Sequence, residues 1–194
     1  MSKFELFYPV RPAKINQAFG NLNPFYKENG IDIIGHNGID FFAPEGAPIY
    51  ATHNGICYPG IDSKGGNGVE IRTEEEYDYQ EQKVRFKTIY WHLQKADAVV
   101  KTGQKVEAGD LIGYADNTGL STGPHLHFGL KPQVWDKENW IWLNPEQNNG
   151  YLGAISPEPF FNAYYAEDAQ KVFTILNQII DLLKSSIMNW GKTP

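Results

Sequence analysis

The sequence contains a single cysteine, no long apolar run and no excess of basic residues. Cys57 has no partner cysteine, so an intramolecular disulfide and a zinc cluster of several cysteines are both excluded. Because no window of about 18 apolar residues occurs, we expect no transmembrane segment, and residues 1–10 show no signal peptide. The 17 lysines and arginines are outnumbered by 23 aspartates and glutamates, which gives a net charge of −6. A chain without a basic stripe is not expected to bind nucleic acid.

The 194 residues hold enough apolar and aromatic side chains for a substantial core. This length suits one domain with an appendage, which we expect to be residues 1–161 followed by a helical extension over 162–194. Up to about residue 130, glycine, proline and asparagine separate short β-rich runs. The pattern predicts a mainly β domain of antiparallel strands.

Small β hairpins are expected in three segments of this domain. Residues 48–58 contain the pair Asn54-Gly55, which suits a tight turn because both residues tolerate positive φ. Residues 68–73 and 84–93 are interpreted as two strands joined by an acidic loop, a solvated hairpin tip rather than a cation site. A third segment with two turn glycines is expected to contribute short strands to a barrel or sandwich: residues 100–113, with Gly103 and Gly109.

Beyond residue 130 the sequence predicts two further features. Residues 131–163 are interpreted as a long ordered loop whose aromatic side chains either stack on a ligand or pack over the sheet: Trp135, Trp140, Trp142 and Tyr151. From residue 164 to 190, apolar residues recur every three or four positions, which predicts an amphipathic helix. That helix either packs on its own domain or forms a homodimer or partner contact. Lys171 and Lys184 provide too little basic charge to favour a membrane surface.

Two pairs of side chains suit a metal centre. His36 and Asp40 flank an Asn-Gly turn, which can bring an imidazole and a carboxylate, both of them zinc ligands, toward one point. His125 and His127 lie two positions apart on an expected strand, so they share one face while the residues that alternate with them face the core. Two imidazoles side by side are explained by a metal, or by one ligand beside one base.

The remaining two histidines differ in their expected roles. His92 ends a strand on which alternation places Trp91 on one face and Tyr90 with His92 on the other. His92 is therefore expected on a polar face that opens into a cleft. His53 adjoins the expected turn at Asn54 and is interpreted as a bystander.

Taken together, these motifs resemble those of the lysostaphin/LytM-type zinc metalloendopeptidases, which cut peptide bonds in bacterial peptidoglycan. The resemblance covers about residues 8–161 and includes Gly-His-Asn-Gly-Ile-Asp-Phe at 35–41 and Gly-Pro-His-Leu-His-Phe at 123–128. Further matching motifs follow one another in order along the chain, at residues 18–20, 43–51, 90–93, 106–113 and 117–122.

The resemblance implies a complete site. The zinc ligands would be His36, Asp40 and His127, holding one Zn²⁺ per chain, with His92 and His125 acting on the substrate. It also implies the lysostaphin/LytM-like fold, a duplicated hybrid motif of antiparallel sheet in a barrel-sandwich, here followed by a C-terminal α-helix. The expected partner is a peptidoglycan peptide, either a stem peptide or a glycine-rich cross-bridge, and the expected location is extracellular, in the cell wall or periplasm.

The catalytic hypothesis divides the work between two imidazoles. His125 would act as general base toward water and then pass the proton to the leaving amine, while His92 would bind the developing oxyanion or orient the water. Some relatives place a tyrosine near the metal, and Tyr26 is a candidate for it. Residues 21–34 and 131–155 are expected to form the groove walls that decide which bond is cut.

Two other functions compete with this interpretation. A non-catalytic wall-binding or activator module could share the fold, but such relatives lack ligands that are present here. A cysteine hydrolase would have to use Cys57, which lies between Ile56 and Tyr58 in an expected strand, where a buried and inert thiol is the usual outcome.

Overall fold

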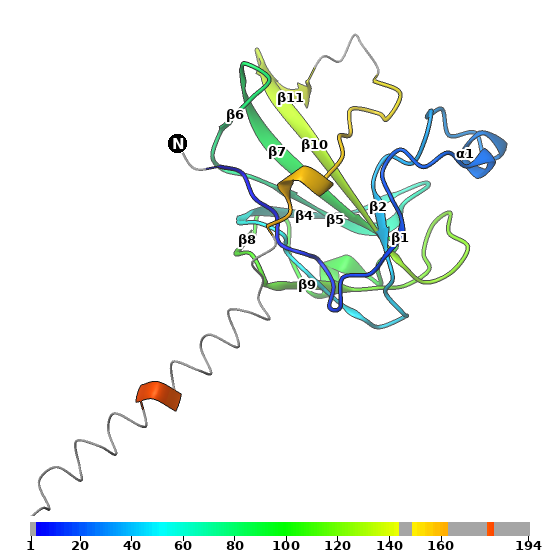
Figure 1. The fold of residues 1–194 in the computed structure, drawn as a ribbon, viewed down its shortest axis with the longest axis horizontal. Helices are drawn as coiled ribbons and strands as arrows, with labels where there is room; N and C mark the ends of the chain where they lie inside the picture. The colour runs from blue at the N-terminus through cyan, green and yellow to red at the C-terminus, as the bar shows by residue number, and fades with distance from the viewer. Residues whose placement is uncertain (1–2, 144–148, 163–177, 181–194) are drawn as a thin grey trace, which may run out of the picture. The chain divides into compact units, whose positions relative to one another are not determined.

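The computed structural model describes residues 3–143, 149–162 and 178–180 (Figure 1). The chain divides into two compact units, Met1–Phe161 and Asn162–Pro194. In the second unit residues 178–180 are helical, and the rest of the helix expected over 164–190 lies outside the described residues. No helix within the described ranges is long and apolar enough to cross a membrane.

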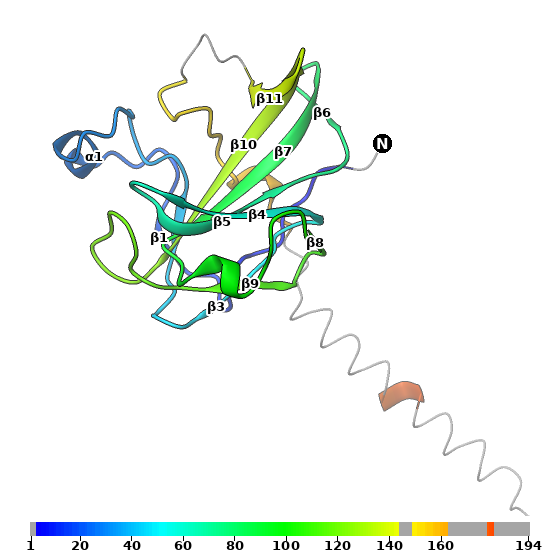
Figure 2. The ribbon, with the colours of Figure 1, turned by 180° about the vertical axis from the view of Figure 1, so that it is seen from behind.

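The first unit is built on an antiparallel sheet of nine strands (Figures 1 and 2). Seven strands follow one another across the sheet in the order β1 (Ile15–Gln17), β2 (Ile39–Phe41), β10 (Leu126–Asp136), β7 (Gln82–Trp91), β5 (Gly66–Arg72), β4 (Gly55–Asp62) and β8 (Lys105–Val106). Two more extend it at the side, where β11 (Asn139–Trp142) pairs with β10 and β6 (Tyr77–Tyr79) pairs with β7. The expectation of a mainly β, antiparallel domain is confirmed.

The described part of this unit also contains a second sheet and three short helical segments. The second sheet pairs β3 (Pro48–Tyr50) with β9 (Leu111–Tyr114). Helix α1 (Pro24–Glu28) is preceded by Asn23, whose side chain accepts a hydrogen bond from the Phe25 N–H, as an N-cap residue does. Two 3₁₀ turns, Ala96–Ala98 and Glu158–Phe160, lie in the connections.

The strand β10 separates the core from the opposite face of the sheet. Leu126, Phe128 and Leu130 are fully buried and belong to the apolar core. The residues that alternate with them, among them His127 and Lys131, line a cavity on the other face. The period of two therefore puts polar chemistry on one face and the core on the other, as the sequence predicted for 125–130.

The prediction of a hairpin over residues 48–58 is wrong. Strand β3 pairs with β9, whereas β4 pairs with β5 and β8. Asn54 accepts a hydrogen bond from the Ala108 N–H at 2.9 Å. Gly55 is needed for a close approach and not for a turn, because a Cβ there would lie 2.4 Å from the Arg72 carbonyl oxygen.

The prediction of a loop over residues 131–163 is also wrong for its first part, up to residue 142. β10 continues to Asp136 and returns as β11 through a turn in which Lys137 has a φ of 53°. Pro132 obscures the strand because proline donates no hydrogen bond. It is tolerated there because it lies one residue beyond the last β10–β11 pair, Gln133 with Trp142.

The other predicted strands are confirmed. β5 pairs with β7, and the acidic loop between them contains the additional short strand β6. Gly103 and Gly109 have φ values of 82° and 94°, which side chains rarely adopt, and flank the short strand β8.

Candidate metal centre

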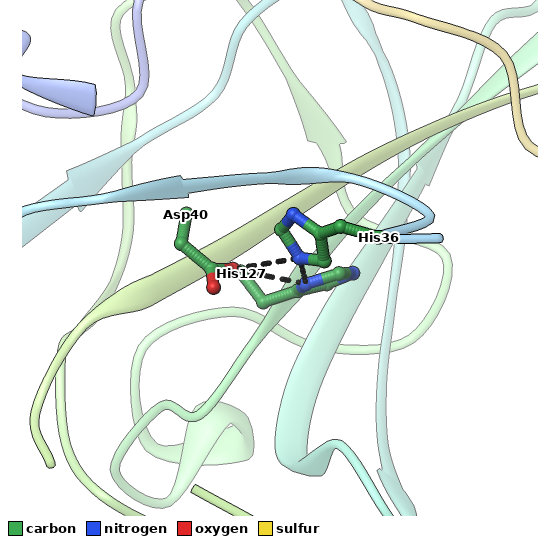
Figure 3. A group of neighbouring side chains, drawn as sticks. All are labelled: His36, Asp40 and His127. Atoms are coloured by element: carbon green, nitrogen blue, oxygen red, sulfur yellow. Dashed lines mark hydrogen bonds and ion pairs between the residues drawn. The ribbon is translucent and has the colours of Figure 1, made fainter. Parts of the chain in front are cut away.

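Three side chains from two neighbouring strands and the loop before them converge on one point (Figure 3). Asp40 on β2 lies directly opposite His127 on β10, and His36 precedes Asp40 by four residues in the chain. The Asp40 Oδ1 atom is 3.1 Å from His36 Nε2 and 3.1 Å from His127 Nδ1, and the two ring nitrogens are 3.0 Å apart. The structure thus brings together the three residues that the resemblance implies as ligands.

The backbone determines how His36 presents its ring. Its Nδ1 lies 3.2 Å from the Ala18 carbonyl oxygen. A carbonyl can only accept, so Nδ1 carries the hydrogen and Nε2 has a free lone pair directed at Asp40 and His127. Tyr26 stacks parallel to the His36 ring with centroids 5.9 Å apart, and its hydroxyl accepts a hydrogen bond from Gln17 at 2.7 Å. Burial raises the pKa of Tyr26, and the charge of Asp40 adds to this effect.

The close packing around His127 leaves no room for a side chain at position 38. A Cβ on Gly38 would lie 2.8 Å from His127 Nε2 and 2.6 Å from the Phe128 carbonyl oxygen. Gly38 is therefore required for β2 to approach β10 closely enough to join Asp40 to His127.

The three ligand atoms fit a divalent metal ion. All lie within 4.8 Å of one another. A tetrahedral ion with bonds of about 2.0 Å separates its ligands by roughly 3.3 Å, close to the separations seen here. Burial alone would raise the pKa of Asp40, but the imidazoles of His127 and His36 beside it outweigh this effect and hold the pKa well below its usual range. Burial lowers the pKa of His127. One carboxylate with two neutral imidazoles is a donor set that zinc accepts.

The other two predicted histidines lie beside this group. His92 Nδ1 is 2.7 Å from the Thr118 carbonyl oxygen, and His125 Nδ1 is 2.8 Å from the Gly123 carbonyl oxygen. Each ring therefore carries its hydrogen on Nδ1 and leaves Nε2 free. The ring centroids of His92 and His125 are 4.6 Å apart, and His125 Nε2 lies 3.6 Å from Asp40 Oδ1. Burial lowers the pKa of His92 to about 4, so this ring is neutral at pH 7.

His92 reaches the cleft by a different route from the one predicted. Tyr90 is fully buried in the core, whereas Trp91 and His92 both line the cavity. Strict alternation would have placed His92 on the core side with Tyr90. The strand ends at Trp91, and His92 adopts a φ of 62°, which turns its side chain to the same side as Trp91.

His53 and Cys57 lie in the core, away from the cavity lining. Both ring nitrogens of His53 are bonded, Nδ1 to the Asn54 carbonyl at 2.8 Å and Nε2 to the Thr88 hydroxyl at 2.9 Å. Burial raises the pKa of the Cys57 thiol to about 12, with a contribution from Asp110. A buried thiol that stays protonated does not act as a nucleophile, which leaves the cysteine hydrolase without support.

The metal-binding group lies in a cavity of about 410 Å³. One wall is the α1 region, with Phe25, Tyr26, Ile31 and Ile33. The remaining lining includes Trp91, Ile89 and Gly129 on the strands, Leu120–Thr122 in a loop, Leu152, and the charged residues Glu70, Lys87 and Lys131. Both segments expected as groove walls, 21–34 and 131–155, contribute residues. Gly129 lies on the face predicted for His125 and His127, whereas Ile89 and Trp91 were not predicted to line the site. Their alternation with the buried Tyr90 on β7 could have identified them.

The four aromatic residues singled out from the sequence do not line this cavity. Trp135 is 56% exposed and packs edge-on against Trp140, with ring centroids 5.4 Å apart. The Arg85 guanidinium lies 4.5 Å from the Trp140 ring centroid, and Tyr151 packs on Phe19 at 4.6 Å. Their observed contacts are packing contacts.

Comparison with protein families gives one assignment. The model of peptidase family M23 matches residues 34–139, a range that contains all five residues implied by the resemblance. Among curated relatives, the peptidoglycan DD-endopeptidase ShyC of Vibrio cholerae is 36% identical over 120 residues, which cover 60% of this chain and 25% of ShyC. The glycyl-glycine endopeptidase ALE-1 of Staphylococcus capitis is 38% identical over 99 residues, or 51% of this chain and 25% of ALE-1. The chain thus spans about a quarter of the length of these curated relatives.

Solved structures agree with this assignment. The catalytic domain of the antimicrobial peptidase lysostaphin from Staphylococcus simulans is 28% identical with a TM-score of 0.54, over 76% of this chain and 91% of that one. A zinc-containing peptidase from Vibrio cholerae is 34% identical with a TM-score of 0.52, over 64% of this chain and 36% of that one. The lysostaphin-like fold that the motifs implied is confirmed.

Proposed function

Because the chain belongs to peptidase family M23, we propose that it is a zinc-dependent endopeptidase that hydrolyses peptide bonds of bacterial peptidoglycan. We assign this activity to residues 1–161 and treat residues 162–194 as an extension. The observation that carries the proposal is the convergence of His36 Nε2, Asp40 Oδ1 and His127 Nδ1 at separations of 3.0–3.1 Å inside a cavity.

His36, Asp40 and His127 would hold the zinc ion. When bound, zinc supplies Lewis acidity, which polarises a peptide carbonyl and lowers the pKa of a water molecule from 15.7 to about 7. The protein contributes the fixed ring orientations, since the Ala18 carbonyl holds His36 and the close approach at Gly38 holds His127. The parallel ring of Tyr26 covers the face of His36.

We assign the role of general base to His125. Its hydrogen on Nδ1 is engaged by the Gly123 carbonyl, so Nε2 accepts a proton from water and later delivers it to the leaving amine. The imidazolium formed in between is stabilised by Asp40, whose Oδ1 lies 3.6 Å from His125 Nε2.

We assign a positioning role to His92. This ring is neutral, and its only hydrogen is engaged by the Thr118 carbonyl at 2.7 Å. The free Nε2 is therefore an acceptor that orients the attacking water by receiving a hydrogen bond from it. The tautomer favours this task over binding of an oxyanion, the alternative for His92.

The substrate, location and partners follow from the proposed activity. The substrate is a peptidoglycan stem peptide or cross-bridge, and the site of action is the cell wall or periplasm. A partner contact through the C-terminal segment stays a prediction. A non-catalytic wall-binding or activator module has no support from the site, because ligands and both further histidines lie together.

Mass spectrometry of fragments released from purified peptidoglycans tests the proposal. Peptidoglycans that differ in cross-bridge chemistry are incubated with the full chain, with a chelator, and with the chelated protein after zinc is added back. We expect new amino termini from one class of bond, none with chelator, and recovery with zinc. Release that survives thorough metal removal contradicts the metal-dependent mechanism, and no release under any condition favours the non-catalytic module.

A further inference from the structure

The cavity continues from the metal-binding group along one face of the sheet to a group of charged residues. On β10, His127 is followed on the same face by Gly129 and Lys131. Lys131 lies opposite Lys87 on β7, and Lys87 lies opposite Arg72 on β5. Three strands in register thus place three cations in one row, in a chain whose net charge is −6. Lys131 and Lys87 of this row line the cavity.

Among the described residues, one carboxylate, that of Glu70, is bonded to these cations. Glu70 accepts hydrogen bonds from Lys87 at 2.8 Å and from Arg72 at 2.9 Å. Within the described part of the chain, the Lys131 ammonium forms no hydrogen bond or ion pair, and its closest aromatic contact is the Trp142 ring, 4.9 Å away. Asp62, also in the cavity lining, directs its carboxylate to the N–H groups of residues 64 and 65.

Burial and a neighbouring cation affect the Lys131 ammonium. Burial lowers its pKa to about 8, and the charge of Lys87 acts in the same direction, whereas the charges of Glu70 and Asp62 act in the opposite direction. The ammonium therefore remains mostly protonated at pH 7 while half-buried. A charged group in such a place is stabilised when an anion with good geometry joins it.

We propose, on the basis of the function proposed above, that Lys131 binds a carboxylate of the substrate peptide, with Lys87 beside it. Lys131 is four residues from His127, which corresponds to about 13 Å along a strand, or roughly four residues of an extended peptide. Gly129 lies between them without a side chain, so a substrate backbone has room along the floor. Stem peptides carry free carboxylates, whereas the interior of an oligoglycine bridge carries none. The preferred substrate class is therefore an acidic stem peptide.

Titration calorimetry with matched peptides tests this assignment. The probes are a synthetic stem-peptide dimer with free carboxylates, the same dimer with its carboxylates converted to amides, and pentaglycine. The protein is the zinc-loaded full chain carrying His125→Ala to suppress turnover, and cleavage is followed in parallel without that substitution. We expect the acidic dimer to bind about tenfold more tightly than its amide form or pentaglycine.

Three variants at lysine positions locate the effect. Lys131→Met should reduce the preference for the acidic dimer to within about twofold while leaving affinity for the amide dimer unchanged. Lys131→Arg should retain most of the preference because it keeps the charge. Lys95→Met, at a lysine that is 80% exposed, should retain all of it and controls for the change in net charge.

The possible outcomes separate this assignment from the proposed function. The assignment is wrong if Lys131→Met keeps the preference, if it weakens both dimers equally, or if no peptide binds. If the acidic dimer binds through Lys131 but the chain without His125→Ala cleaves none of the probes or wall preparations, the endopeptidase function fails and the carboxylate site stands.

Discussion

Polar side chains on the two faces of the central sheet differ in how many of their hydrogen-bonding atoms are bonded within the protein. On the core face, His53 has both ring nitrogens bonded, and the Tyr90 hydroxyl lies 2.7 Å from the Thr52 hydroxyl and 2.9 Å from the Thr52 N–H. On the cavity face, His36, His92 and His125 each have one nitrogen held by a backbone carbonyl, and the other is directed toward the site.

This difference distinguishes structural from functional polar groups. A buried group whose hydrogen-bonding capacity is used internally contributes to folding and has nothing left for a ligand. A ring fixed through one nitrogen is oriented and still has a lone pair for a metal or a water molecule. Lys131 belongs to the second type, because its ammonium is half-buried and lacks a carboxylate partner among the described residues.

The largest effect is expected from removing the carboxylate of the cavity face. Asp40→Ala leaves two ring nitrogens facing each other without the anion that joins them, so the metal should be lost. Initial rates of peptide release should fall at least about 10³-fold, since the ion supplies several kcal/mol of transition-state stabilisation. Far-ultraviolet circular dichroism checks that the fold persists. A folded variant with activity within about tenfold of the parent contradicts the assigned site.

A smaller loss is expected at His92. His92→Ala removes the acceptor that orients water but no ligand, so turnover should fall by about 10²–10⁴ while zinc stays bound. The His92→Gln variant retains a hydrogen-bonding side chain and should recover part of kcat with little change in KM. If His92→Ala lowers kcat by less than about threefold, His92 is only a packing residue.

Substitution of His53 on the core face should change the free energy of unfolding and leave catalysis unchanged. Burial lowers the pKa of His53 to about 4, whereas an unfolded histidine has a pKa near 6.5. The unfolded state therefore takes up a proton first as the pH falls, so His53 stabilises the fold above pH 6.5 and this contribution is lost down to about pH 4. The shift corresponds to about 3 kcal/mol.

Urea unfolding of chelated protein at several pH values between about 7 and 4 measures this contribution. The His53→Gln variant should lose less free energy of unfolding over that range than the parent. Zinc affinity of the variant should be unchanged at pH 7. Equal pH dependence in the two proteins contradicts the role assigned to the buried ring.

The smallest effect is expected at Cys57. The thiol is fully buried and its pKa is about 12, so alkylating reagents should not reach a thiolate under native conditions. Activity after treatment with iodoacetamide should stay within about 20% of the untreated protein, and intact-mass measurement should show no adduct. Rapid adduct formation with parallel loss of activity points to a reactive thiol.

Much of this site could be predicted from the sequence because its motifs are local. The five-residue span from His36 to Asp40 and the alternation from His125 to His127 each specify a geometry without knowledge of the rest of the fold. That these motifs meet in one site is what their resemblance to the lysostaphin/LytM-type family implies. The assignment of buried Leu126 and Phe128 to the core follows from the same alternation.

Other features depend on contacts between distant segments. Residues 48–58 contain no signal that β3 pairs with β9. The Asn54-Gly55 pair favoured a turn, but Gly55 is needed because the backbone passes close to the Arg72 carbonyl. The positive φ of His92 breaks the alternation on which its predicted face depended. The row of Lys131, Lys87 and Arg72 exists only through the register of three strands.

Zinc stoichiometry, measured by equilibrium dialysis with elemental analysis, distinguishes the three proposed ligands from the two further histidines. We expect one zinc per intact chain, none in His36→Ala or His127→Ala, and one in both His92→Ala and His125→Ala. Loss of zinc from all four variants alike, or zinc retained after loss of His36 and His127, would contradict this expectation.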